Sequence, residues 1–324
     1  MHPKEVRIVF MGTPDFAVES LKALVENGYN VVGVITAPDK PAGRGQQLSE
    51  SAVKKYAVAN GLSILQPEKL KNPEFIAELE SLKADLQVVV AFRMLPEVVW
   101  SMPPMGTFNL HGSLLPKYRG AAPLNWAIIN GEKETGVTTF LLSHEIDTGK
   151  IMFQEKTEIA DDDNVGSVHD RLMKIGAKLV LKTVDELALG NILAIDQEQL
   201  IQNPEDVKHA PKIFKEDCRI DWTRDMESVR NLIRGLSPYP TAWTELSHKL
   251  KSETLTVKIF AAEKDNNLPA APGSIYTDGK KFLKIACPDG WLSITDLQLS
   301  GKRRMKIDEL LRGFHDFGNW IVNV

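Results

Sequence analysis

The amino-acid sequence predicts an α/β fold: a doubly wound, mostly parallel sheet of the Rossmann-like kind, followed by a small OB-like β-barrel domain. Strand and helix patterns alternate through the first half of the 324-residue chain, as they do when helices cover both faces of a parallel sheet. A polar, proline-containing stretch then interrupts the pattern, and short strand patterns at regular spacing follow it. A chain of this length forms two domains more often than one.

The first half opens with an apolar run at residues 6–11, a Gly-Thr-Pro turn and a helical pattern over 15–25. Further strand patterns, all short and apolar, occupy 31–36, 63–65, 86–92, 106–111 and 137–142. Further helical patterns, with apolar residues every three or four positions, occupy 51–60, 73–82, 124–130 and 165–189. We therefore place a doubly wound domain at residues 1–190.

The pattern loosens after Gly190, and residues 191–208 have the polar composition of a linker. The second domain, residues 209–324, contains one helical pattern at 226–235. Its strand patterns are short and separated by turn residues, at 242–246, 254–260, 273–276, 282–286 and 291–297. This spacing is typical of a small antiparallel barrel.

Composition excludes several classes of protein. Hydrophobic residues make up 43% and charged residues 25% of the chain, which is ordinary for a globular protein and unlike a disordered or fibrous one. The longest apolar runs are too short to cross a bilayer, and no signal or transit peptide is visible. We expect a cytoplasmic protein with no membrane partner. The two cysteines, Cys218 and Cys287, form no Cys-x-x-Cys motif, so the sequence supports neither a disulfide framework nor a metal site.

Charge is unevenly distributed along the chain. Residues 209–324 carry 18 Lys and Arg against 15 Asp and Glu, which leaves 21 against 28 in residues 1–208. The second domain is thus slightly basic although the whole chain has a net charge of −4. Such an asymmetry can mark an anionic partner, although surface lysines usually serve solubility alone.

The turn after the first strand pattern contains Gly12 but not the Gly-x-Gly-x-x-Gly spacing of dinucleotide-binding loops. A nicotinamide cofactor is therefore disfavoured. A tight turn from strand to helix explains Gly12 at least as well as contact with a ligand.

The strand pattern at 106–111 ends in two polar residues, Asn109 and His111. Alternate side chains of a strand point to the same face, so both project to one side at the carboxyl edge of the sheet, where open α/β sheets place their active sites. A lone histidine is more often structural than catalytic. The residues that follow favour the catalytic interpretation, because Gly112 permits close backbone approach and residues 113–116 form an irregular loop.

A carboxylate, Asp147, follows the next strand pattern in a polar loop. An Asp close to Gly149 also suits an ordinary turn. Because strands adjacent in sequence are usually neighbours in a sheet, we expect Asp147 to face His111 across the sheet edge. An amide, an imidazole and a carboxylate suit attack by an amine on a carbonyl, since donors stabilise the oxyanion and the carboxylate helps to remove a proton.

Several longer segments resemble the signature of the folate-dependent formyltransferases, and the resemblance extends over essentially the whole chain. The segments that carry it are Phe108-Asn109-Leu110-His111-Gly112-Ser113-Leu114-Leu115-Pro116, Tyr118-Arg119-Gly120, Asp147-Thr148-Gly149, Met11-Gly12-Thr13-Pro14-Asp15-Phe16, Pro38-Asp39-Lys40-Pro41-Ala42-Gly43-Arg44-Gly45, Ala210-Pro211-Lys212-Ile213, Arg219-Ile220-Asp221-Trp222 and Pro238-Tyr239-Pro240. The similarity is greatest to those members that formylate initiator methionyl-tRNA.

The resemblance implies a reduced folate, 10-formyltetrahydrofolate, as formyl donor, and no metal. It makes Asn109, His111 and Asp147 the catalytic residues. It also implies that two segments bind the folate, a loop of Ser113, Leu114, Leu115 and Pro116 and a strand exit of Phe92, Arg93, Met94 and Leu95 that lines the pterin pocket largely through backbone groups. At Phe92 and Arg93 the sequence departs from the small or Tyr-Gly-type residues that are commoner in the family.

The resemblance further implies initiator methionyl-tRNA, not DNA, as the partner. The loop at 37–49, otherwise a flexible surface connection, would reach the acceptor stem with Arg44 as its working residue. Arginine suits this role because its planar fork binds phosphate bidentately and stacks on bases. Basic residues of the second domain would contact the tRNA, with Lys212, Lys215, Arg219, Lys302, Arg303, Arg304 and Lys306 as candidates.

Two other functions stay open at this point. A formyltransferase that acts on a small amine, such as an amino sugar or a purine precursor, would show the same catalytic residues, but it needs no Arg44 loop. A non-catalytic RNA-binding protein on a decayed enzyme fold is a second alternative, against which the intact Asn109, His111 and Asp147 argue.

Overall fold

The structure is a computed structural model that describes residues 1–42, 47–265 and 268–324, and it divides into two compact units. Unit 1 consists of Met1–Gly120, Thr135–Thr157 and His169–His209. Unit 2 consists of Ala121–Glu134, Glu158–Val168 and Ala210–Val324. Two short segments from the first half of the chain therefore belong with the C-terminal unit.

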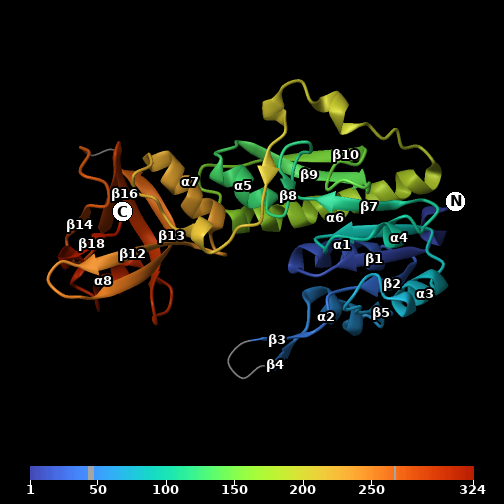
Figure 1. Ribbon diagram of the computed structural model, residues 1–324, viewed down its shortest axis with the longest axis horizontal. Helices are drawn as coiled ribbons and strands as arrows, with labels where there is room; N and C mark the ends of the chain where they lie inside the picture. Colours follow the sequence, from blue (N-terminus) through green and yellow to red (C-terminus); the bar gives the residue numbers. More distant parts are fainter. Residues whose placement is uncertain (43–46, 266–267) are drawn as a thin grey trace. The chain divides into compact units, whose positions relative to one another are not determined.

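Unit 1 is built on a seven-stranded sheet with the order β10-β9-β7-β6-β1-β2-β5 (Figure 1). Strands β5, β2, β1, β6 and β7 run parallel, whereas β9 is antiparallel to β7. The strand bounds are β1 (Ile8–Gly12), β2 (Val31–Ile35), β5 (Ile64–Leu65), β6 (Leu86–Val90), β7 (Thr107–His111), β9 (Glu134–Leu141) and β10 (Ile151–Glu158). The predicted doubly wound, mostly parallel sheet is confirmed.

Helices flank this sheet (Figure 1). They are α1 (Asp15–Glu26), α2 (Ala52–Ala59), α3 (Pro73–Ser81), α4 (Glu97–Trp100) and α6 (Val165–Leu189). On one face Val9 of β1 clusters with Phe75 of α3 and Val99 of α4. On the other face α6 approaches β7 so closely that a Cβ at Gly176 would lie 2.6 Å from Leu110. Each such buried apolar side chain stabilises the fold by roughly 1.5–3 kcal/mol, so covering both faces holds β7 in place.

Several elements of unit 1 are absent from the sequence prediction, among them α4, β10 and the strands of a hairpin. Strand β10 was not predicted, because its second half is largely exposed and polar, as is common at a sheet edge. The loop predicted at 37–49 contains a two-stranded hairpin of β3 (Lys40–Ala42) and β4 (Gln47–Ser49). Arg44, which falls between these two strands in the sequence, lies outside the described residues.

Unit 2 contains a second seven-stranded sheet, in which β14-β15-β16-β13-β12-β18 are neighbours in that order and β17 pairs with β16. Its strands are β12 (Ala242–His248), β13 (Thr254–Asp265), β14 (Ile275–Thr277), β15 (Leu283–Cys287), β16 (Gly290–Leu299), β17 (Met305–Lys306) and β18 (Trp320–Val322). The pairings recorded are antiparallel, and β14 also contacts β18, so the sheet is nearly closed. The predicted antiparallel barrel is confirmed.

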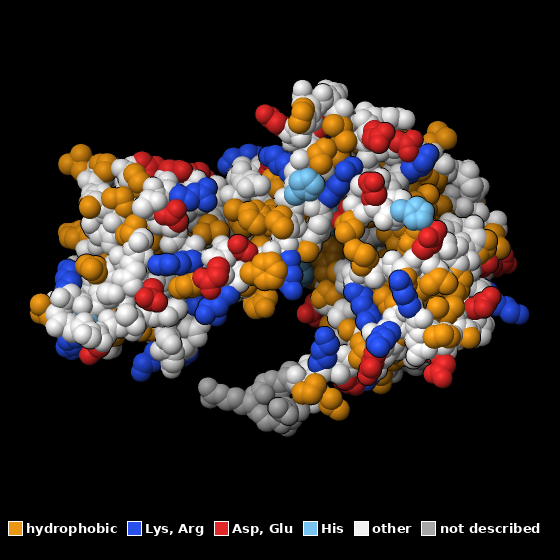
Figure 2. Space-filling model, in the orientation of Figure 1, with side chains coloured by type: hydrophobic (Ala, Val, Ile, Leu, Met, Phe, Trp, Pro, Cys, Tyr) orange, Lys and Arg blue, Asp and Glu red, His pale blue; other side chains and the backbone are white. Residues whose placement is uncertain are grey.

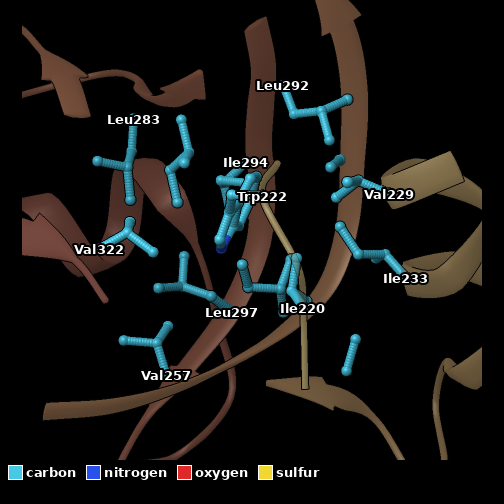
Figure 3. Close-up of a cluster of buried hydrophobic side chains, with 14 of the residues drawn as sticks. Ile220, Trp222, Val229, Ile233, Val257, Leu283, Leu292, Ile294, Leu297 and Val322 are labelled. Atoms are coloured by element: carbon cyan, nitrogen blue, oxygen red, sulfur yellow. The ribbon is translucent and has the colours of Figure 1, made fainter. Parts of the chain in front are cut away.

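The barrel core is centred on Trp222, which is fully buried among aliphatic side chains (Figure 3). Its indole nitrogen donates a hydrogen bond to the hydroxyl of Thr244 at 3.0 Å, so the one polar group of this large side chain is satisfied. Helix α7 (Met226–Leu236) adds Val229 and Ile233 to the same core. In the same unit, α5 (Pro123–Ile129) packs against α7, and Asn125 donates to the carbonyl of Gly235 at 2.8 Å.

Several basic side chains of unit 2 are paired with acidic ones, and Figure 2 shows Lys and Arg interspersed with Asp and Glu on the visible face. Arg304 binds the buried Asp296 through two hydrogen bonds of 2.9 and 2.7 Å and lies 4.2 Å from the Phe260 ring centre. Burial alone raises the pKa of Asp296, but Arg304 and Lys306 together hold that pKa below its usual value. Arg303, by contrast, pairs with Glu309 at the exposed surface.

We expect Arg304→Ala to destabilise the barrel by about 1–3 kcal/mol at pH 7, because it removes two charge-assisted hydrogen bonds from a buried carboxylate. The matched control, Arg303→Ala, should change stability little, since exposed ion pairs contribute little. Asp296 has a lowered pKa in the folded protein, so the contribution of its ionised form is present above about pH 4. That contribution is lost as the pH falls further, through the lowered pKa.

Chemical denaturation followed by tryptophan fluorescence measures the free energy of unfolding of both variants. Equal losses of stability for Arg303→Ala and Arg304→Ala at pH 7 would contradict this account of Asp296.

Candidate active site

The candidate site begins at the carboxyl end of β7, where Asn109 and His111 occupy alternate positions of the strand. Asn109 is paired with Val89 of β6 on one side and with Phe140 of β9 on the other. The His111 ring is buried and meets the Phe140 ring edge to face, with 6.4 Å between the ring centres. Within the described part of the chain no group hydrogen-bonds the partly exposed amide of Asn109, which leaves its donors for a substrate.

The orientation of the His111 ring is set by a backbone carbonyl. Nε2 of His111 lies 2.8 Å from the carbonyl oxygen of Tyr118, a residue in the left-handed region with a φ of 63°. A carbonyl oxygen only accepts hydrogen bonds, so we assign a proton to Nε2. Nδ1 is then the ring nitrogen that faces Asp147 and is available for chemistry.

Asp147 reaches His111 although β9 runs antiparallel to β7. The antiparallel pairing sets Leu141, the last residue of β9, beside Phe108 rather than beside His111. The loop after β9 therefore has to double back, and it brings Oδ2 of Asp147 to 3.9 Å from Nδ1 of His111. The same oxygen accepts a hydrogen bond from the Gly120 amide at 2.9 Å.

Gly149 makes this reversal sterically feasible. A Cβ at Gly149 would lie 1.6 Å from the carbonyl oxygen of Leu141 and 3.2 Å from the Phe140 ring. Since real Cβ atoms essentially never approach other atoms so closely, only glycine fits where the returning chain crosses the end of β9. The Asp-Thr-Gly motif thus combines a candidate catalytic carboxylate with a steric requirement for glycine two residues later.

The loop of Ser113 to Pro116 directs most of its side chains into the protein. Ser113, Leu115 and Pro116 are buried and Leu114 is half-buried. The Thr138 hydroxyl donates to the Ser113 carbonyl at 2.6 Å and accepts from the Leu115 amide at 3.1 Å. A ligand along this loop would therefore meet Leu114 and backbone groups, not the hydroxyl of Ser113, which donates to the Lys117 carbonyl.

The strand exit after β6 lies beside the end of β7, because Val90 pairs with Leu110. Met94 is 72% exposed, whereas Leu95 is buried. Arg93 donates to the carbonyl oxygens of Pro67 and Glu68, and partial burial lowers its pKa. The guanidinium is thus committed to a neighbouring loop, which leaves Phe92, Met94 and backbone groups to face a ligand.

Sequence reasoning missed a polar cluster at the base of the β3–β4 hairpin. Asp39 is bound by Lys54 and accepts a hydrogen bond from Gln66 at 2.9 Å. Lys54 also lies 3.0 Å from Glu50, on the other arm of the hairpin. The bond to Lys54, followed by that to Gln66, keeps the pKa of Asp39 below its usual value. These pairs tie the described ends of the hairpin to α2.

The basic residues proposed to contact nucleic acid have different surroundings. Lys212 is exposed and its ammonium lies 5.4 Å from the ring centre of Phe214, which is itself 62% exposed. Lys215 and Arg219 both lie close to the Trp243 ring. Cations over partly exposed aromatic rings resemble the surfaces on which bases stack, whereas Arg304 already binds the buried Asp296.

None of the helices in residues 1–42, 47–265 and 268–324 has the length and apolarity that a bilayer crossing requires. Across the same ranges, His, Cys, Asp and Glu side chains form no group of three or more that could hold a metal ion.

Comparison with known proteins identifies the family. A family model described as formyl transferase matches residues 6–184, and one described as formyl transferase, C-terminal domain, matches residues 212–315. The chain is also 60% identical, over 316 residues and 97% of each chain, to a methionyl-tRNA formyltransferase of Bacteroides fragilis. The chain belongs to the formyl transferase family.

Solved structures share the fold of this formyl transferase at low sequence identity. An N-formyltransferase from Helicobacter canadensis, in complex with folinic acid and dTDP-3-aminofucose, matches 93% of this chain and 100% of its own, with a TM-score of 0.64 and 20% identity. HypX from Aquifex aeolicus, in complex with tetrahydrofolic acid, matches 96% of this chain with a TM-score of 0.63 and 19% identity. The formyl transferase chain spans 48% of the length of HypX.

We expect Gly149→Ala to destabilise the formyl transferase by about 1–3 kcal/mol or more, since backbone atoms block the added methyl group. It should also slow formyl transfer, because relief of the clash moves Asp147. The matched control is Gly313→Ala, where a Cβ would meet no atom within 4 Å and φ is ordinary. Denaturation midpoints and transfer rates are the measurements. A Gly149→Ala protein as stable and as fast as the parent would show that the chain does not cross β9 as described.

Proposed function

We propose that this protein transfers the formyl group of 10-formyltetrahydrofolate to the α-amine of initiator methionyl-tRNA, in the cytoplasm. The observation that carries the proposal is the meeting of His111 and Asp147, 3.9 Å apart, in a chain 60% identical to a methionyl-tRNA formyltransferase. On the same strand as His111 lies Asn109, whose amide no described residue binds. Residues 1–190 would carry the chemistry, residues 191–208 the linker and residues 209–324 a tRNA-binding surface.

The geometry supports a distinct role for each proposed catalytic residue. The amide of Asn109 donates to the formyl oxygen as negative charge develops on it during attack by the amine. Nδ1 of His111, when protonated, donates to the same oxygen, while Nε2 stays bound to the Tyr118 carbonyl. The carboxylate of Asp147 stabilises that proton by electrostatic attraction and, through water, accepts the proton that the amine loses. Collapse of the tetrahedral intermediate then breaks the bond between the formyl carbon and the folate nitrogen, which takes up a proton as tetrahydrofolate leaves. The Gly120 amide keeps this carboxylate in place.

The residues at the sheet edge fit a folate donor. A pterin needs a flat apolar surface with backbone donors and acceptors along its edge. Phe92 and Met94 supply apolar surface and the strand exit supplies backbone groups, and Leu114 of the second loop adds a half-buried apolar side chain. The acidic tail of a folate would extend toward solvent. These residues bind and orient the donor, and the bound donor supplies the formyl group.

A tRNA partner accounts for features that a small amine does not require. The ends of the β3–β4 hairpin are anchored by Asp39 and Lys54. Such anchoring suits a segment that presents Arg44 to the acceptor stem of the tRNA. Lys212 and the exposed Phe214 offer charge and a stacking surface for nucleotides. In this proposal Arg303 contacts the tRNA backbone, and Arg304 both supports the barrel and adds to its positive field.

The main alternative is formylation of a small amine. The Helicobacter canadensis structure, in complex with an amino-sugar nucleotide, shows that this fold accommodates a small acceptor. Full-length similarity to a methionyl-tRNA formyltransferase, including the C-terminal domain, favours the tRNA.

The decisive experiment compares acceptors for the purified full-length chain with 10-formyltetrahydrofolate. We expect kcat/KM for initiator methionyl-tRNA to exceed that for glycinamide ribonucleotide or a dTDP-amino sugar by at least about 100-fold, because a site built for one acceptor leaves polar groups unpaired with another. Methionyl elongator tRNA, included as a third acceptor, tests initiator specificity. Faster transfer to either small amine would contradict the proposal, and absence of any transfer would favour the non-catalytic alternative.

We expect Asn109→Ala and His111→Ala each to lower the single-turnover rate by roughly 100-fold or more, as when one oxyanion donor is lost from a preorganised site. Folate is held at saturation so that the rate reports chemistry. The matched control is His315→Ala, which removes an exposed histidine of unit 2. Rates within a few fold of the parent for both site variants would remove these residues from the mechanism.

A further inference from the structure

Gln197 is a buried amide that joins two parts of the candidate active site. It lies at the start of the short helix η2 (Gln197–Leu200) and is 2% exposed. Its Nε2 donates to the carbonyl oxygens of Asp147 and Gly149, at 2.8 and 2.9 Å. Its Oε1 accepts from Nε and Nη2 of Arg119, at 3.0 and 2.7 Å. Both ends of the amide are therefore fully used.

Arg119 determines which way the amide faces. A guanidinium only donates hydrogen bonds, so the atom that it contacts has to be the amide oxygen. The NH₂ group then faces two carbonyl oxygens, which only accept. The assignment of donor and acceptor is thus required by the chemistry of the partners on both sides.

The two carbonyls that Gln197 binds belong to the segment that doubles back toward His111. Asp147 has a φ of 55°, a conformation that costs a non-glycine residue of order 1 kcal/mol and persists where neighbouring groups enforce it. Gly120 holds the carboxylate of Asp147 from one side, and Gln197 holds its backbone from the other.

These contacts close a ring. Arg119 and Gly120 are consecutive residues of β8 (Arg119–Gly120), so one strand binds the Asp147 side chain through Gly120 and the Gln197 amide through Arg119. The Arg119 amide in turn donates to the Lys208 carbonyl at 3.1 Å. Displacement of any one member therefore loosens the others.

We propose that Gln197, oriented by Arg119, is a positioning residue that holds Asp147 at its distance from His111 and thereby sets the rate of formyl transfer. The inference rests on the catalytic role proposed above for Asp147. Gln197 touches neither substrate and acts through the backbone of the Asp147 loop.

A purely structural role is the competing explanation, because the segment around Gln197 also packs on unit 1. Ile195 and Ile151 exchange two backbone hydrogen bonds of 2.8 Å, and Asp196 pairs with Lys150 at 3.3 Å. These contacts attach the segment without Gln197. A test therefore has to separate attachment of the segment from positioning of Asp147.

The substitution Gln197→Glu separates attachment of the segment from positioning of Asp147. The substitution is nearly isosteric and keeps an acceptor for Arg119, now as an ion pair, so it preserves attachment. It replaces the NH₂ group by an oxygen that faces two carbonyl oxygens, so it removes the support of Asp147. The matched control is Gln199→Glu, the same chemical change at an exposed position of the same helix.

We expect Gln197→Glu to lower kcat by about 10- to 100-fold, the loss that follows a small displacement of a catalytic group. KM for 10-formyltetrahydrofolate and for methionyl-tRNA should stay within about twofold of the parent, and Gln199→Glu should leave both constants unchanged. An unchanged kcat, or a loss confined to KM, would overturn the inference. If Gln197→Glu does not fold by circular dichroism, Gln197→Met, which removes every bond of the amide without adding charge, is measured against the same outcomes.

A double-mutant cycle with Asp147→Asn identifies the residue through which Gln197 acts. We expect Gln197→Glu to cause little further loss of kcat in the Asp147→Asn background. If the fold losses of kcat from the two substitutions multiply in the double variant, the inference about Gln197 is overturned and the proposed role of Asp147 is not. Parental activity of Asp147→Asn itself would instead remove the proposed role of Asp147, and the inference with it, so the two failures are distinguishable.

Discussion

The crossing of Gly149 over the carbonyl group of Leu141 is the constraint on which the candidate site depends. Strand β9 is antiparallel to β7, so its last residue pairs at the far end of β7 from His111. A carboxylate that follows β9 can reach His111 only if the chain returns across the strand end, and no side chain fits at the crossing point. Every later contact of Asp147 follows from this reversal.

Close to that reversal, polar groups of unit 1 form hydrogen bonds with one another. Thr138 lies opposite His111 in the sheet, and its hydroxyl binds the Ser113 carbonyl, the Leu115 amide and the Gln154 side chain. A buried network of this kind is rigid when every member is paired, because each lost bond would leave an unsatisfied group in a medium of low dielectric constant. The rigidity explains how one strand and one loop can hold Asn109, His111 and Asp147, the proposed catalytic residues, in a fixed arrangement.

The cations of unit 2 differ in their surroundings. Arg304 neutralises a buried carboxylate, Lys212 and Lys215 lie over aromatic rings at the surface, and Arg303 pairs with an exposed carboxylate. The surface cations can exchange their surroundings for phosphate, whereas removal of Arg304 from Asp296 would leave a buried charge unpaired. Net charge along the sequence does not distinguish these surroundings, since it counts every cation equally.

The sequence by itself determined the doubly wound sheet, the barrel and the positions of Asn109, His111 and Asp147, because strand periodicity and the local motif are properties of adjacent residues. Tertiary structure alone decided the rest. The direction of β9 depends on pairing between strands far apart in the chain, and it brings Asp147 to His111 by a returning loop rather than along a common sheet edge. The polar stretch around Gln197 has the composition of a linker, and nothing local shows that this amide lies against a residue 50 positions earlier. Burial and hydrogen-bond partners of a polar side chain are set by the packing of the whole unit, so a sequence pattern can single out candidate catalytic groups but not the residues proposed to hold them in place.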